Sequence, residues 1–117
     1  MPRTTVLAPL LLGILLAAPA VAEGKALPLV TARQLAAWCD ADGAPEQSLC
    51  AGYVLGVSDV LAADLPVHGR RACFPVGVRS GSLIQAVRAF LAEHPRRGFE
   101  RATEITAEAL AKAYPCS

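Results

Sequence analysis

Four cysteines that follow an apolar N-terminal segment constrain this 117-residue chain more than any other feature. An even number of cysteines in a short exported chain is typical of a disulfide framework, because oxidising compartments keep such thiols paired. The pattern predicts a small domain held by disulfides, and it argues against a cytosolic metal or redox protein. The four residues are Cys39, Cys50, Cys73 and Cys116.

The N-terminal segment has the three parts of a secretory signal peptide. Arg3 supplies a positive charge, residues 6–18 are apolar, and Ala20-Val21-Ala22 is a small-x-small cleavage site. We expect cleavage after Ala22, which makes residues 1–22 the signal peptide and residues 23–117 a single domain. A retained membrane anchor is the alternative, but the apolar run is shorter than the ~20 residues that a span needs. The leader fits a bacterial export product and predicts a periplasmic location.

The charge balance of the predicted mature chain is neutral. The whole chain has 11 basic and 10 acidic residues, and the expected cleavage removes Arg3. A neutral domain offers no electrostatic reason to expect a nucleic acid or an anionic lipid surface as a partner. No second apolar stretch is long enough to span a membrane, so we expect no membrane contact after cleavage.

The mature sequence is expected to form an all-α domain of four helices, arranged as two helical hairpins. Apolar residues recur at three- and four-residue steps, and Gly and Pro separate the segments. The expected helices run from the N-cap Thr31 to residue 39, over 46–64, from 80 or 82 to 94, and over 100–113. Their predicted inward faces comprise Leu35, Trp38 and Cys39; Leu49, Tyr53, Val57, Val60 and Leu61; Leu83, Val87, Phe90 and Leu91; and Ala102, Ile105, Ala109, Leu110 and Ala113.

The second expected helix contains a motif of Gly52, Tyr53, Gly56 and Asp59. A glycine inside a helix costs about 1 kcal/mol relative to alanine. Two glycines one turn apart therefore predict that another backbone or a ring approaches the helix closely, with simple tolerance as the alternative. For Asp59 we favour a structural role, such as capping a neighbouring backbone, over proton transfer.

Antiparallel hairpins favour one of the three ways to pair the cysteines. The first hairpin brings Cys39 close to Cys50, and the second brings Cys73 close to Cys116. Pairing Cys50 with Cys73 would need a strained return along a long helix. The chain-entropy model gives about 3 kcal/mol for the shorter loop and about 4 kcal/mol for the longer one.

No set of residues in the sequence predicts catalysis, a metal site or a cofactor. His68 and Cys73 do not have the spacing of a known cysteine nucleophile, and export favours oxidised thiols. The cysteines also lack the close C-x-x-C pairs of zinc sites. His94 ends a helix, where the dipole favours a positive charge. We therefore expect a protein that is not an enzyme.

Two basic loops are the candidate partner-binding residues. Arginine is enriched at protein interfaces, and a loop held by a nearby disulfide loses less entropy on docking. The alternative is ordinary solvated surface charge. The first loop contains His68, Arg70 and Arg71, and the second contains Arg96 and Arg97, followed by Arg101.

The chain resembles the Rap/Tai family of type VI secretion immunity proteins. The combination of C-x-G-Y-x-x-G-x-x-D with a terminal aromatic-Pro-Cys is the most specific part of the resemblance. The matching segments follow the family order over nearly the whole mature chain and are Leu35–Cys39, Cys50–Asp59, Cys73–Val78, Phe90–Pro95 and Ala109–Cys116.

The resemblance implies a small all-helical periplasmic protein that binds and sterically blocks a peptidoglycan amidase delivered by a rival or sister cell. Some members of the family are dimers, so a homodimer is a further expectation. The motif residues mainly look structural, and the inhibitory contacts are expected in the loops. The alternatives are a small acid-stress chaperone of the periplasm and a structural subunit of an envelope complex.

Overall fold

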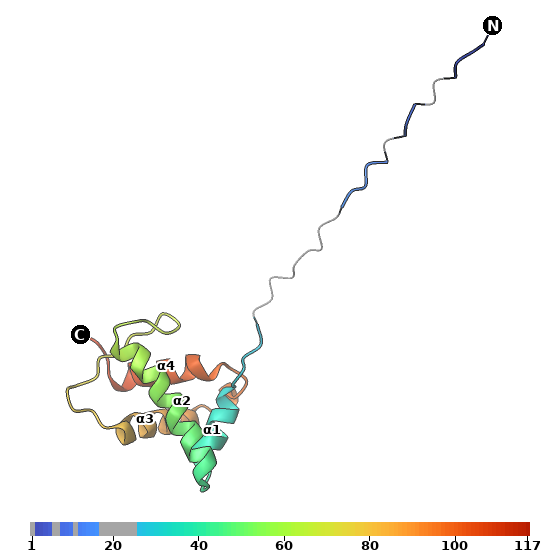
Figure 1. Cartoon of the computed structure of the whole chain (residues 1–117). Coiled ribbons are helices and arrows are strands. Elements are labelled where there is room, and N and C mark those ends of the chain that lie inside the picture. The colour runs from blue at the N-terminus through green and yellow to red at the C-terminus, as the bar shows by residue number, and fades with distance from the viewer. Residues whose placement is uncertain (1, 6–7, 11, 17–25) are drawn as a thin grey trace.

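The computed structural model describes residues 2–5, 8–10, 12–16 and 26–117, and it folds as four α-helices with one short 3-10 turn (Figure 1). The predicted cleavage site at residues 20–22 lies outside the described residues. No β-strand occurs in the described part of the chain, so the all-α prediction is confirmed. The elements are α1 (Ala32–Asp40), α2 (Ala44–Ala62), α3 (Ser80–Glu93), η1 (Pro95–Arg97) and α4 (Ala102–Ala113).

Helix α1 begins after Thr31, as the sequence predicts. The Thr31 hydroxyl accepts a hydrogen bond from the Gln34 backbone N–H at 3.2 Å, and Gln34 Oε1 accepts one from the Thr31 N–H at 2.9 Å. This reciprocal capping box satisfies two backbone donors that no helical carbonyl reaches.

Helices α2 and α4 differ in their boundaries from the sequence prediction. Helix α2 begins two residues before Glu46, because Gly43 is its N-cap and Pro45 fits the first turn, and it ends before Asp64, which has a φ of 60°. Helix α4 begins at Ala102, because the residues before it pair with the segment that leads into α1. Thr31 and Arg101 form an isolated antiparallel bridge there.

The buried face of α2 is rotated from the one that the apolar pattern predicted. Val57 and Leu61 are buried as expected, but Leu49 and Val60 are exposed and Tyr53 is only half-buried. The prediction was wrong at Leu49 and Val60 because α2 is apolar on all sides, so spacing alone does not single out one face. The residues that α2 buries are Cys50, Val54, Val57, Ser58 and Leu61.

The core lies where the four helices meet, and each α-helix contacts the other three. The apolar residues predicted for α3 are all buried, as are Leu35 and Cys39 in α1, whereas Trp38 is half-buried. In α4 the prediction holds except at the last residue, Ala113, which is exposed. The α4 residues that were predicted and are buried are Ala102, Ile105, Ala109 and Leu110.

Both predicted disulfides are confirmed. Cys39 at the end of α1 bonds to Cys50 in α2 with a Cα–Cα distance of 4.9 Å. Cys73, in the loop before α3, bonds to Cys116 after α4 with a Cα–Cα distance of 5.0 Å. One bridge therefore closes each helical hairpin. Among the described residues, no helix is both long enough and apolar enough to cross a membrane.

Candidate partner-binding surface

The loop that follows α2 carries a tight turn at residues 67–70. His68 and Gly69 both have positive φ values, 48° and 73°, as in a type I′ turn. The backbone N–H of Val67 donates to Arg70 O at 3.0 Å, and the N–H of Arg70 donates to Val67 O at 2.9 Å. The turn therefore has a defined backbone shape and presents the first group of predicted binding residues.

One side chain within the turn and one just after it hold the loop in place. His68 Nε2 lies 2.8 Å from the Thr103 hydroxyl oxygen in the first turn of α4. The Arg71 guanidinium donates to the Asp64 carboxylate at 2.6 Å and to the Asp64 carbonyl at 3.0 Å. Arg71 thus closes the base of the loop, in addition to being half exposed to solvent.

The end of the same loop is fixed to the C-terminal segment. The Cys73 N–H donates to Tyr114 O at 2.9 Å, next to the Cys73–Cys116 disulfide. The Phe74 and Tyr114 rings pack edge to face with centroids 5.3 Å apart. The loop is therefore held at its start, at its tip and at its end, so a partner would meet an ordered surface.

Glu108 of α4 brings the two predicted basic loops together. Arg97 of η1 donates to both Glu108 carboxylate oxygens, at 3.2 and 2.7 Å, and also to Glu100 at 3.0 Å. Arg70 approaches Glu108 from the other loop, with a separation of 3.9 Å. Sequence reasoning missed Glu108, because its partners lie 11 and 38 residues away and no local signal marks it.

The ionisation of this cluster follows from its hydrogen bonds. The bonds from Arg97 lower the pKa of Glu108, and partial burial opposes that change to a smaller extent. The same bonds, first to Glu108 and then to Glu100, raise the pKa of Arg97. Both groups are therefore charged at neutral pH, and Arg97 is committed to contacts within the chain.

The ring of Phe90 packs against this cluster. His94 stacks on Phe90 with ring centroids 4.1 Å apart, and its Nδ1 donates to Phe90 O at 2.8 Å, since a carbonyl only accepts. The cations of Arg97 and Lys112 lie 5.7 and 5.9 Å from the centre of the same ring. These contacts hold His94 in the fold and use the face of Phe90.

The five predicted binding residues therefore differ in what they can offer. Arg97 is half-buried and bound to Glu100 and Glu108, and Arg71 binds Asp64 at the base of the loop. Arg70 is half exposed with one long ionic contact, and Arg96 is exposed with no carboxylate within 4 Å in the described part of the chain. Among the predicted binding residues, Arg70 and Arg96 are the arginines that remain available for a partner.

The predicted packing motif of α2 does not meet a close neighbour. A Cβ atom added at Gly52 or Gly56 would contact nothing within 4 Å among the described residues, so the expected close approach within the chain is wrong. Both glycines are exposed, as is Asp59. Tyr53 does pack, with its ring 6.5 Å from that of Trp38, and burial raises its pKa although hydrogen bonding to Thr103 opposes this.

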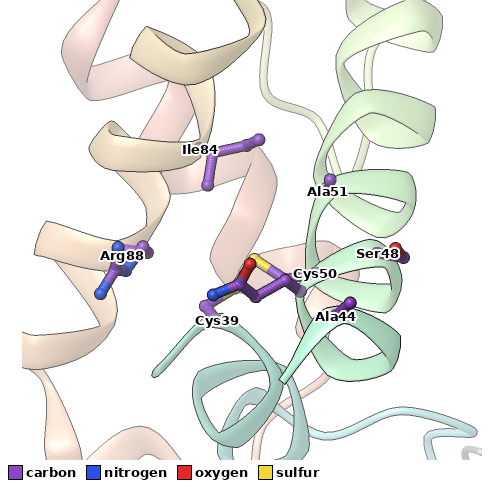
Figure 2. Close-up of a pocket in the computed structure, with 8 residues that line it drawn as sticks. Cys39, Ala44, Ser48, Cys50, Ala51, Ile84 and Arg88 are labelled. Atoms are coloured by element: carbon purple, nitrogen blue, oxygen red, sulfur yellow. A yellow bond between two sulfur atoms is a disulfide. The ribbon is translucent and has the colours of Figure 1, made fainter. Parts of the chain in front are cut away.

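A shallow groove of about 450 Å³ lies between α2 and α3 above the Cys39–Cys50 bridge (Figure 2). Sequence reasoning did not find this groove, because its walls come from three helices. Arg88 enters from α3, where it lies 3.7 Å from Asp40, and Ser48 lies on α2. The residues that line the groove include no His, Asp or Glu, so Ser48 has no general base there. Within the described ranges, no group of three or more metal-ligating side chains is arranged to hold a metal ion.

Comparison with known proteins identifies the family. The family model of the Rap1a immunity proteins matches residues 31–116, from the N-cap of α1 to the last cysteine. The chain belongs to the Rap1a immunity protein family. No curated protein and no solved structure matches the chain significantly.

Membership of the Rap1a family points to immunity against a type VI secretion effector and implies an effector protein as the partner. Immunity proteins of this kind are generally not enzymes. The matched region contains both disulfides, all four α-helices and both basic loops, so the surface described above belongs to the family domain.

Proposed function

We propose that this Rap1a immunity protein binds a type VI peptidoglycan amidase in the periplasm and blocks its active site sterically. The leader at residues 1–22, with cleavage after Ala22, would deliver it to the compartment where the amidase acts. The protein itself performs no chemistry and uses neither metal nor cofactor. It protects the cell because cell-wall peptides cannot reach the covered catalytic cysteine of the amidase.

The observation that carries this proposal is the fixed turn at residues 67–70. Thr103, Asp64 and the Cys73–Cys116 bridge hold the loop that contains the turn. A preorganised loop loses little conformational entropy when it enters a groove. Arg70 and Arg96 add exposed positive charge that can steer an acidic rim of the effector toward the turn.

The proposal also includes self-association through the open face of α2. Leu49, Gly52, Gly56 and Val60 lie exposed along this helix, and an apolar face with small residues allows two helices to approach closely. A homodimer would place two basic turns on one assembly. Light scattering that shows a monomer at micromolar concentration would contradict this part of the proposal.

The test of the main proposal uses the neighbouring open reading frame, read for a Cys/His amidase that lacks a leader. We expect this protein to co-purify with the immunity protein and to lyse cells unless the immunity protein is present. Absence of binding would contradict the proposal. Protection of client proteins from aggregation at low pH, without binding to the amidase, would instead support an acid-stress chaperone.

Arg70→Glu should weaken binding to this amidase at least about tenfold, because charge reversal replaces attraction by repulsion at the turn. The matched control is Arg88→Glu. It makes the same charge change at a residue whose one ionic contact, 3.7 Å to Asp40, resembles the 3.9 Å contact of Arg70 with Glu108. Calorimetric titration that finds equal affinities for both variants would show that the turn is not the contact.

A further inference from the structure

Three large apolar side chains lie exposed near the start of the folded domain. The exposed fractions are 88% for Leu27, 97% for Leu29 and 73% for Phe99. We call these three residues the apolar patch. Single exposed apolar residues are common, but a group of them at one place on the surface is a feature of interaction sites.

Backbone hydrogen bonds hold the two segments that carry the apolar patch. The N–H of Ala102 donates to Val30 O at 3.0 Å, and the N–H of Ala32 donates to Glu100 O at 2.8 Å. The Arg101 guanidinium also donates to the Ala26 carbonyl oxygen. The patch residues are therefore exposed although hydrogen bonds hold the backbone of the residues beside them, which reduces the entropy that docking would cost.

Two shallow hollows, both lined by Pro28, lie at the apolar patch. One, of about 400 Å³, is lined by Leu27, Thr31 and Phe99 among others. The second, of about 440 Å³, is lined by Leu29, Tyr53 and Thr103 among others. An apolar side chain of a partner could fill either hollow and remove patch residues from water.

Two arginines line the hollows of the apolar patch, and a third is close to Phe99 in the sequence. Arg33 lines the first hollow, Arg101 lines the second, and Arg96 lies three residues before Phe99. None of the three has a carboxylate within 4 Å in the described ranges, whereas Arg97 takes up Glu100 and Glu108. A partner surface complementary to these arginines would carry carboxylates.

The apolar patch adjoins the basic turn through Thr103. This residue lines the hollow beside Leu29, and its hydroxyl contacts His68 Nε2 at 2.8 Å. Figure 1 shows the N-terminal segment and the start of α4 meeting at one side of the helices, with the loop after α2 lying along α4. One partner can therefore cover the turn and the patch together.

We propose that the effector docks an apolar projection on Leu27, Leu29 and Phe99, with effector carboxylates against Arg33, Arg96 and Arg101. This inference rests on the proposed function and assigns the apolar part of its interface. A second copy is disfavoured as the occupant. Two-fold pairing through the patch would bring the arginine-bearing surfaces of both copies together, and their like charges would repel.

Phe99→Ser tests the inference, with Val76→Ser as the matched control. Val76 is also an exposed apolar residue, but it lies in the loop before α3. Both variants should keep the helical circular dichroism and the melting temperature, because neither side chain is packed in the core. With the amidase from the neighbouring open reading frame, titration should show Phe99→Ser binding at least about tenfold more weakly than wild type and Val76→Ser within about twofold.

The outcomes separate the two proposals. If the wild-type protein does not bind the amidase, the proposed function fails and this inference fails with it. If wild type binds and Phe99→Ser binds equally well, only the patch assignment is overturned. It is also overturned if Phe99→Ser converts a dimer to a monomer without changing affinity for the amidase, since a second copy would then occupy the patch.

Discussion

Thr106 is a single buried residue whose hydroxyl is expected to lower the stability of this small core. It lies fully buried in α4, and its hydroxyl has no hydrogen-bond partner in the described part of the chain. By contrast, the buried Ser58 hydroxyl donates to Val54 O at 2.7 Å. A buried polar group without a partner loses its hydration and gains nothing in return.

Thr106→Val should therefore raise the free energy of unfolding by about 1 kcal/mol, because it replaces the unpaired hydroxyl by a methyl group of similar size. Urea denaturation of both proteins would measure the difference. Thr106→Ser is the control, since it keeps the hydroxyl, removes a methyl group and should lower stability. A valine variant that is less stable than wild type would mean that the hydroxyl makes a contact in solution.

The arginines show that the sequence of a loop does not reveal which of its charged side chains form ion pairs in the fold. Sequence alone predicts that the two basic loops carry charge, but Arg97 and Arg96 are neighbours with opposite situations. Arg97 is bound by Glu108 and Glu100, whereas Arg96 is exposed. The difference depends on where α4 places Glu108, so no pattern within either loop could reveal it.

Between elements, the Glu108 cluster joins α4 to η1 and to the loop after α2. Glu108→Gln should lower the free energy of unfolding by about 1 kcal/mol near neutral pH, as expected for a partly buried bidentate ion pair. Because folding lowers the pKa of Glu108, this stabilisation is present above the ordinary value of 4.5 and is lost as the pH falls through the folded pKa.

Denaturation of Glu108→Gln and wild type across pH 7 to pH 2 would measure the effect. The two stabilities should converge at the acidic end, where the carboxylate is protonated in both states of the wild type. Glu104→Gln is the control, since Glu104 is an exposed residue of α4 with no ion pair among the described residues. A difference that stays constant down to pH 2 would rule out the ion pair as its cause.

The helices themselves were largely predictable. The Thr31 cap and the buried faces of α3 and α4 follow from local signals, which act within one or two turns. Helix α2 was the exception, because its apolar residues surround it and the buried side is chosen by its neighbours. The start of α4 also shifted, since pairing with the segment before α1 extends the preceding residues.

For the whole molecule, the two disulfides should carry a large share of the stability. The alanine double variant of Cys73 and Cys116 should lose about 4 kcal/mol of unfolding free energy, because that bridge spans 43 positions. The variant of Cys39 and Cys50, whose bridge spans 11 positions, should lose about 3 kcal/mol plus the packing of two buried sulfurs.

Urea denaturation of both double variants would test these values. A loss below about 1 kcal/mol for either would mean that the unfolded chain is already compact without that bridge. The variant without the Cys73–Cys116 bridge should also bind the amidase more weakly, since the turn at residues 67–70 then loses one of its anchors.

The sequence by itself predicted the helical class and the favoured disulfide pairing, because periodicity, capping and the position of each cysteine near a helix end are local signals, while its motifs resemble the immunity family whose model matches the chain. Only the tertiary structure decided which side of α2 is buried, that Glu108 unites the two basic loops, and that Leu27, Leu29 and Phe99 gather on one surface. Those outcomes depend on contacts between residues far apart in the chain, and such contacts form only when the helices pack.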